Sequence, residues 1–178
     1  MAPVAGELSD HYAPRTRTLR LSEPIYGSRS MAAVGVAAHE VGHAIQHAQN
    51  YAPLGFRSAW VPVANFGGGL SMLVLMGALM MGGATTALGG KLGLLGVLLF
   101  ATTTVFTLVT LPVEFDASRR ALVTLERGGY VSPQELTGAK KVLDAAAMTY
   151  VAAFVTSLLT LLYWAWRLGL IGGGRDDR

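Results

Sequence analysis

The sequence predicts a mainly α-helical integral membrane protein, and two features lead to that prediction. Apolar residues make up 52% of the 178 residues and charged residues only 14%, against roughly 25% charged residues in soluble domains. Between Arg57 and Glu114 the one charged residue is Lys91. Three stretches reach the roughly 20 apolar residues that a bilayer-crossing helix needs. They are 61–83, 92–111 and 145–168. We therefore expect a single membrane-embedded domain over residues 1–178 with about three transmembrane helices.

Composition also limits the function. A net charge of +3 without a basic stripe gives no indication of nucleic-acid binding. Because the chain has no cysteine, it forms neither a disulfide framework nor a thiolate metal site, so a metal would need His, Asp or Glu ligands. A soluble protein of this size has too little polar surface to cover three wholly apolar helices, which favours a lipid bilayer as their surroundings.

The first expected element is a short β-strand or ribbon near the N-terminus. Residues 16–21 alternate between polar and apolar side chains, as a strand does. Two roles remain open for this strand. It either pairs through a free edge with an extended substrate, or it is an ordinary β-ribbon.

The next element is a helix that contains most of the candidate chemistry. Ser28 or Ser30 caps its start, and Asn50 with Pro53 marks its end. Its apolar residues recur at spacings of three and four and predict a packing face. They are Val34, Ala38, Val41, Ile45 and Ala48. The histidines form a separate line on the helix, which consists of His39, His43 and His47.

Residues 39–43 read His-Glu-Val-Gly-His, an H-E-x-x-H motif. Side chains four residues apart lie one above the other on a helix, so His39 and His43 can both bind one metal ion. Glu40 is expected beside the metal, where it can accept a proton from a metal-activated water. The competing interpretation is a chance match on a polar helix face, which is costly for three histidines and an unpaired glutamate in a membrane protein.

A catalytic zinc site normally has three protein ligands, so a third is expected besides the two histidines. His47 lies one further turn along the same helix, and a straight helix does not readily bring three successive turns to one ion. Glu114 is the favoured candidate, because it follows the second apolar stretch in a helix that continues to Gly128 and Gly129. Its competing role is an interfacial charge at a helix end.

The apolar stretches and the segment between them carry further signals. Glycines in the first stretch predict close contact with a partner helix or a second copy of the chain. They are Gly67, Gly68, Gly69, Gly77, Gly82 and Gly83. Ser132, Pro133 and Glu135 predict the capped start of a helix that runs towards the third stretch. Interfacial aromatic residues end that stretch. They are Tyr163, Trp164 and Trp166.

Basic residues predict the orientation in the membrane. Ten of them precede the first stretch or lie between the second and third. They are Arg15, Arg17, Arg20, Arg29, Arg57, Arg119, Arg120, Arg127, Lys140 and Lys141. The loop after the first stretch has only Lys91, and the C-terminal tail has Arg167, Arg175 and Arg178. The positive-inside rule therefore puts residues 1–57 and 112–144 in the cytoplasm, where they can form one site.

Three runs of the sequence, Asp10-His11-Tyr12, 36–46 and 111–118, resemble the neutral zinc membrane metallopeptidases of the YugP type. The resemblance covers nearly the whole chain and implies the inner (plasma) membrane of a prokaryote. Members of that family usually begin with a further apolar segment ahead of the point where this sequence starts. The chain is more distantly similar to HtpX-type membrane peptidases, whose third ligand lies in a Glu-(Phe)-x-Ala-Asp motif after two spans.

Aligned with this HtpX-type motif, Glu114 occupies the position of the ligand glutamate and Ala117 occupies the position of the motif alanine. Ser118 stands where the wider group has aspartate. Asp116 is then an alternative source of a carboxylate that hydrogen-bonds a ligand histidine. His47 is expected to be a solvated histidine at a helix end, with a contact to substrate as its alternative role.

The motif, the shared compartment and the resemblance together predict a membrane-bound zinc endopeptidase with a zincin-like active-site helix. Zinc is the expected cofactor, and polypeptides of membrane or unfolded proteins are the expected substrates. The expected zinc ligands are His39, His43 and Glu114, and the expected general base is Glu40. The alternative is a non-catalytic membrane scaffold or adaptor with a structural zinc site, which needs four protein ligands. Its fourth ligand would come from His47, Asp116 or His11.

Overall fold

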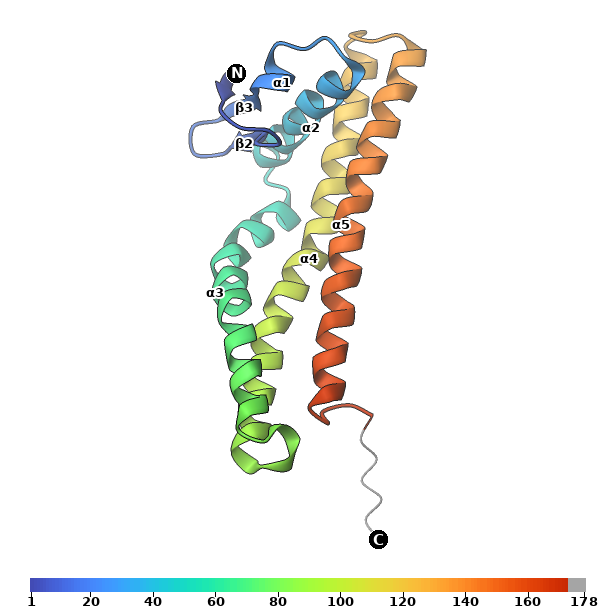
Figure 1. Ribbon diagram of the computed structural model, residues 1–178. Helices are drawn as coiled ribbons and strands as arrows, with labels where there is room; N and C mark the ends of the chain where they lie inside the picture. The colour runs from blue at the N-terminus through green and yellow to red at the C-terminus, as the bar shows by residue number, and fades with distance from the viewer. Residues whose placement is uncertain (173–178) are drawn as a thin grey trace. The chain divides into compact units, whose positions relative to one another are not determined.

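The computed structural model describes residues 1–172 and is mainly helical (Figure 1). Arg175 and Arg178 of the tail lie outside the described residues. The contacts divide the chain into two compact units. The first consists of Met1–Phe56 with Thr110–Tyr150, and the second of Arg57–Val109 with the chain from Val151.

The first unit opens with a small three-stranded sheet in the order β1-β3-β2 (Figure 1). The strands are β1 (Ala2–Val4), β2 (His11–Ala13) and β3 (Thr18–Ser22). The predicted strand is β3, which lies in the centre, parallel to β1 and antiparallel to β2. Both edges of β3 are therefore paired. Of the two roles left open for this strand, pairing of a free edge with an extended substrate is wrong, because the outer strands of the sheet are β1 and β2.

The motif lies on α2 (Met31–Ala48), which follows the one-turn helix α1 (Glu23–Tyr26). Of the two candidate caps the structure uses Ser30, whose hydroxyl accepts a hydrogen bond from the Ala33 N–H at 3.2 Å. The predicted packing face is only partly correct, since Ala48 is exposed. Alanine and glycine instead make up much of the buried face of α2. The buried residues of α2 are Ala33, Gly35, Ala38, Glu40, Gly42 and Gln46.

Helix α2 packs closely against α4 (Ala87–Arg127) within the first unit. A Cβ atom added to Gly42 would lie only 2.2 Å from the carbonyl oxygen of Ala117, so the two backbones touch there. The first turns of α5 (Pro133–Arg167) complete this core. Its buried residues are Ala38, Ala121, Leu125, Ala139 and Leu143. The capping box predicted for α5 is present, with the Ser132 N–H donating to Glu135 Oε2 at 2.8 Å.

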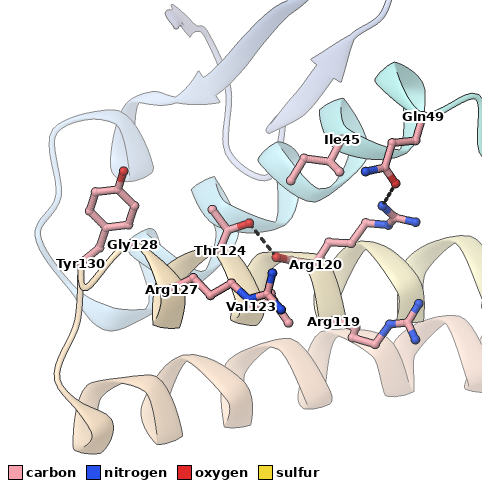
Figure 2. Close-up of a pocket in the computed structure, with 9 residues that line it drawn as sticks. All are labelled: Ile45, Gln49, Arg119, Arg120, Val123, Thr124, Arg127, Gly128 and Tyr130. Carbon is pink, nitrogen blue, oxygen red and sulfur yellow. Dashed lines mark hydrogen bonds between the residues drawn. The ribbon is translucent and has the colours of Figure 1, made fainter.

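A cavity of about 700 Å³ lies beside the last turns of α2 and α4, and Figure 2 shows the side chains around it. Its lining residues are Ile45, Gln49, Arg119, Arg120, Val123, Thr124, Arg127, Gly128 and Tyr130. All of them belong to the first unit.

Within residues 1–172, three helices are long and apolar enough to cross a membrane, as the sequence predicts: α3 (Ala52–Met80), α4 and α5. At most 28% of the residues in the most apolar part of each helix are buried inside the protein. Most of this apolar surface is therefore exposed, as expected for helices that contact lipid. Helix α3 ends at Met80 rather than at residue 83. Gly82 and Gly83 adopt positive φ angles of +93° and +57°, which end the α-helical geometry. The chain continues into the short 3₁₀ helix η1 (Gly83–Thr85).

In the second unit the glycines of α3 meet α4, as close-contact glycines should. A Cβ on Gly67 would lie 2.1 Å from the hydroxyl oxygen of Thr102, and the Trp60 indole N–H donates to the Thr102 carbonyl oxygen at 2.9 Å. Not every glycine serves this contact. A Cβ on Gly69 or on Gly77 would meet no atom within 4 Å.

Candidate metal centre

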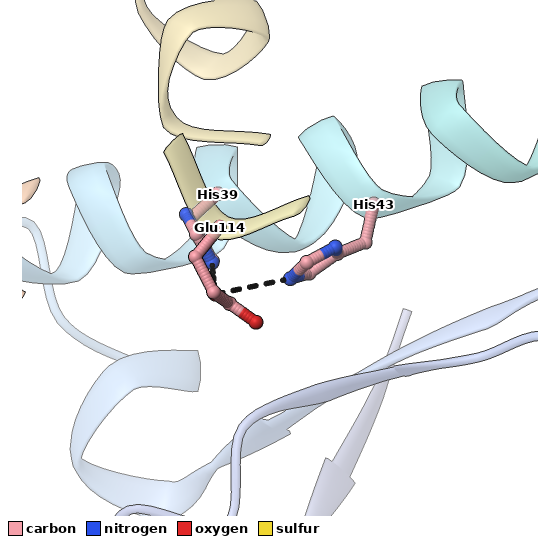
Figure 3. A group of neighbouring side chains, drawn as sticks. All are labelled: His39, His43 and Glu114. Atoms are coloured by element: carbon pink, nitrogen blue, oxygen red, sulfur yellow. Dashed lines mark hydrogen bonds and ion pairs between the residues drawn. The ribbon is translucent and has the colours of Figure 1, made fainter. Parts of the chain in front are cut away.

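Helices α2 and α4 bring His39, His43 and Glu114 together (Figure 3). Glu114 Oε2 lies 3.1 Å from His39 Nε2 and 3.6 Å from His43 Nε2. One ligand atom from each side chain lies within 4.8 Å of the other two. Figure 3 shows the carboxyl group of Glu114 facing both imidazole rings. Three side chains predicted as ligands from distant parts of the sequence therefore converge at one point.

The donor atoms of this cluster fit a zinc ion. Tetrahedral zinc with bonds of about 2.0–2.1 Å places neighbouring ligand atoms about 3.3–3.4 Å apart, and the two distances to Glu114 Oε2 lie on either side of that value. Two imidazole nitrogens and one carboxylate oxygen are a donor set of catalytic zinc sites. Within residues 1–172 the cluster consists of these three side chains, which leaves a fourth position for water or substrate.

Gln46 determines which nitrogen of His43 faces the cluster. Its side-chain nitrogen donates to the Val113 carbonyl oxygen at 2.8 Å and to Asp116 Oδ2 at 3.0 Å. Because both of those partners are acceptors, the other end of the amide must be the oxygen, which accepts from His43 Nδ1 at 3.0 Å. The proton of neutral His43 therefore sits on Nδ1, and the lone pair of Nε2 points towards Glu114.

His39 has an outer partner of a different kind. Its Nδ1 lies 3.1 Å from the Ser118 hydroxyl oxygen, which can accept a hydrogen bond from an Nδ1–H and leave the lone pair of Nε2 facing Glu114. Ser118 thus occupies the position in which the wider group has aspartate. In residues 1–172 no hydrogen bond joins Asp116 to either histidine, and Gln46 links Asp116 to His43. Arg119 and Arg120 also hydrogen-bond the Asp116 carboxylate.

Glu40 is buried next to the cluster and is held by the sheet. The backbone N–H of Tyr12, on β2, donates to Glu40 Oε2 at 2.7 Å. In the part of the chain that the structure describes, Oε1 has no hydrogen bond, so this second oxygen remains able to accept a proton. Sequence reasoning missed Tyr12 as a site residue. The one sequence feature that pointed to Tyr12 was that Asp10-His11-Tyr12 is among the runs that resemble the YugP-type family.

Tyr12 also contacts His47, the third histidine of α2. Its phenol oxygen lies 2.9 Å from His47 Nδ1, and the two rings are 5.7 Å apart. His47 is half-buried near the end of α2 and has this one hydrogen-bond partner among the described residues. A cavity of about 340 Å³ adjoins the pair. His11, the distant candidate for a fourth ligand, is exposed on β2 with its Nδ1 bonded to the Ser9 carbonyl oxygen.

The electrostatic environment of His43 reflects the two nearby carboxylates. Burial lowers the pKa of His43, but Glu114, Glu40 and the Gln46 side chain together raise it by more, so the pKa lies above the usual 6.5. The cluster thus attracts positive charge. At low pH this positive charge is a proton on His43. When the His43 ring is neutral, a metal cation can bind instead.

Comparison with known proteins agrees with this chemistry. Residues 1–169 match the family described as "Putative neutral zinc metallopeptidase". The chain is 44% identical over 175 residues to the Bacillus subtilis (strain 168) protein named "Putative membrane protease YugP", and the alignment covers 98% of this chain and 74% of that protein. No solved structure matches the chain. Since the family match extends over nearly the whole sequence, the chain belongs to the YugP-like family of neutral zinc metallopeptidases.

Proposed function

We propose that this protein is a membrane-bound zinc-dependent endopeptidase. The observation that carries the proposal is the convergence of His39, His43 and Glu114 within 4.8 Å, with the buried Glu40 next to His39 on the same helix. The family match and the name of the Bacillus subtilis relative support the same activity. A cluster of three protein ligands also favours a catalytic site over a closed structural one, which would need four.

In this proposal His39 Nε2, His43 Nε2 and the Glu114 carboxylate hold zinc. Bound zinc supplies a Lewis acid that polarises the scissile carbonyl and acidifies a water molecule. Gln46 and Ser118 keep the two imidazole rings turned so that Nε2 faces inward.

Glu40 is proposed to move the proton. With Oε2 fixed by the Tyr12 N–H, Oε1 accepts a proton from the attacking water as the water oxygen bonds to the carbonyl carbon. Glu40 then delivers this proton to the nitrogen of the leaving amine as the C–N bond breaks. Glu40 is unchanged at the end of the cycle, so one carboxylate serves as base and then as acid.

We further propose that the site faces the cytoplasm of a prokaryotic cell, at its inner membrane. The excess of basic residues in 1–57 and 112–144 supports this orientation. A site at the membrane surface on that side suits segments of membrane proteins and unfolded polypeptides as substrates.

The test is cleavage of an unfolded protein by the detergent-purified chain with zinc, comparing wild type with Glu40→Gln. We expect the variant to keep its zinc and to lose activity by about 10²–10⁴-fold, the usual contribution of a general base. Glu126→Gln, a change of the same type at an exposed position of α4, should leave activity unchanged. Glu114→Ala should lose zinc under mild chelation.

Two results would contradict the proposal in different ways. Full activity of Glu40→Gln would show that another group moves the proton. A wild-type chain that binds zinc but cleaves no unfolded or membrane polypeptide would favour the scaffold alternative.

A further inference from the structure

The cavity beside the ends of α2 and α4 has a lining that the metal centre does not use (Figure 2). Arg120 and Arg127 are seven residues apart on α4 and therefore lie on one face, with Val123 and Thr124 between them. Arg119 lines the same cavity. Ile45 and Gln49 contribute from α2, and neither they nor the other lining residues belong to the cluster of His39, His43 and Glu114. The cavity is thus separate from the zinc cluster.

The charge of this cavity is strongly unbalanced. Three arginines line it and no acidic side chain does. One carboxylate, that of Asp116, pairs with both Arg119 and Arg120. Among residues 1–172, no hydrogen bond or ion pair engages the guanidinium of Arg127. Three positive charges against one negative charge leave an excess of two, which attracts an anionic ligand.

Arg120 is held in place before any ligand arrives. Its Nε donates to Asp116, its Nη1 donates to Gln49 Oε1, and its guanidinium carbon lies 5.5 Å from the centre of the Tyr51 ring. Its side chain is only 20% exposed. A guanidinium fixed on three sides loses little conformational entropy when it binds an anion, and the planar fork of arginine suits phosphate oxygens.

The surroundings of the cavity suggest where the anion comes from. Its three arginines belong to α4, one of the helices that is apolar enough to cross a membrane, and they follow its apolar stretch in the sequence. Basic clusters next to the cytoplasmic end of a spanning helix attract anionic lipids, with about 1 kcal/mol for each Lys or Arg near the surface.

We propose that this cavity binds the phosphate group of an anionic ligand, with an anionic phospholipid headgroup as the expected source and free phosphate as the other source. This site is independent of the peptidase proposal, since its residues and its ligand are different. Arg120 donates from its fixed position, while the exposed side chains of Arg119 and Arg127 close over the phosphate oxygens.

The test measures binding to the full-length chain in detergent by native mass spectrometry and thermophoresis. The probes are short-chain phosphatidylglycerol, short-chain phosphatidylcholine and inorganic phosphate. The pocket variant is Arg119→Gln/Arg127→Gln, which spares Arg120 and its contacts with Asp116. The matched control is Arg15→Gln/Arg29→Gln, which removes the same charge from exposed positions of the same unit.

We expect phosphatidylglycerol to bind the wild type and the control equally, and the pocket variant roughly 25-fold more weakly, at about fivefold for each arginine. Phosphatidylcholine should bind the wild type more weakly than phosphatidylglycerol, because its headgroup has no net negative charge. Binding of inorganic phosphate with the same dependence on the two arginines would assign the source to free phosphate, and its failure to bind would assign it to the lipid.

Three outcomes would overturn the proposal. The first is absence of binding of all three probes to the wild type. The second is an equal loss of affinity in the pocket variant and the control, since attraction to the overall basic surface would then explain the binding. The third is an unchanged affinity in the pocket variant.

Discussion

Gln46 shows how much one buried side chain contributes to the candidate metal centre. It is fully buried, and its single amide group is hydrogen-bonded to His43 on its own helix and to Val113 and Asp116 on α4. All three of its interactions are satisfied, which is the condition under which a buried polar group stabilises a fold rather than weakening it. Gln46 therefore orients a proposed zinc ligand and also contributes to the packing of α2 against α4.

Replacing Gln46 by methionine, which keeps most of the volume and removes the hydrogen bonds, should weaken zinc binding. We expect a loss of about 10–100-fold in zinc affinity, because His43 loses the partner that fixes its ring. The free energy of unfolding should fall by about 1–3 kcal/mol, since the Val113 carbonyl loses its donor. Zinc titration with a competing chelator and thermal unfolding measure the two effects. Gln134→Met, at an exposed position of α5, is the control and should change neither.

His43 also predicts a pH dependence for the metal-free protein. Its pKa in the folded state is raised above the unfolded value by Glu114, Glu40 and Gln46 despite the opposing effect of burial. The resulting stability is fully present below about pH 6.5 and is lost as the pH rises through the raised pKa. The melting temperature of the chelator-treated wild type should therefore decline relative to His43→Gln between pH 6 and pH 8.

Zinc should reverse this trend, because it binds only the unprotonated ring. The increase in melting temperature on adding zinc should grow as the pH rises over the same range. A zinc effect that is largest at pH 6 would contradict the assignment of His43 as a ligand.

At the scale of elements, the close approach of α2 and α4 builds the site. Gly42 is a variable position of the H-E-x-x-H pattern, yet here its lack of a side chain lets α2 touch the backbone of α4 at Ala117. That contact lies one residue from His43 on α2 and three residues from Glu114 on α4, so it sets the distance between the proposed ligands. Four of the six buried residues of α2 are alanine or glycine, which lets the helix pack closely.

Gly42→Ala should therefore damage both the fold and the metal centre. The new Cβ would lie 2.2 Å from the Ala117 carbonyl oxygen and 2.9 Å from its carbon, and backbone atoms cannot move aside as a flexible side chain can. We expect a net loss of about 1–3 kcal/mol of stability, typical of overpacking, together with weaker zinc binding. Calorimetry and zinc titration would measure the two quantities.

Gly35→Ala on the same helix is the matched comparison. Its Cβ would meet Ala139 at 3.7–3.9 Å, an ordinary contact, and the higher helix propensity of alanine should add up to about 1 kcal/mol. Equal effects of the two substitutions would mean that helix propensity alone, and not the contact between α2 and α4, governs these positions.

Local patterns in the sequence were enough to predict the helices and the candidate ligands. Apolar length predicted the three long helices, the two candidate caps Ser28 and Ser30 predicted the start of α2, and the spacing of His39 and His43 predicted a shared partner. The contacts between distant residues could not be predicted in this way. Tyr12 and Glu40 are 28 residues apart and Gln46 and Asp116 are 70 apart, and no periodicity or composition links such pairs. They become visible only when the packing of the sheet, α2 and α4 is known.

For the whole molecule, the decisive question is which side of the membrane the metal centre faces. The proposed ligands lie in 1–57 and 112–144, the two segments that hold ten of the basic residues, whereas the loop around η1 has only Lys91. The positive-inside rule acts through short loops near the ends of spanning helices, and both the η1 loop and the turn before α5 meet that description. The two loops should therefore lie on opposite sides of the membrane.

The cysteine-free sequence makes this orientation directly measurable. Single cysteines at Ala84, exposed in η1, and at Gln134, exposed in α5, can each be labelled in intact cells with a maleimide that does not cross the membrane. In a bacterium whose outer layers admit the reagent, we expect Ala84→Cys to be labelled at once and Gln134→Cys only after the membrane is opened. The reverse pattern would place His39, His43 and Glu114 outside the cytoplasm. The substrates would then have to be sought among exported polypeptides, although the chemistry proposed for Glu40 would be unaffected.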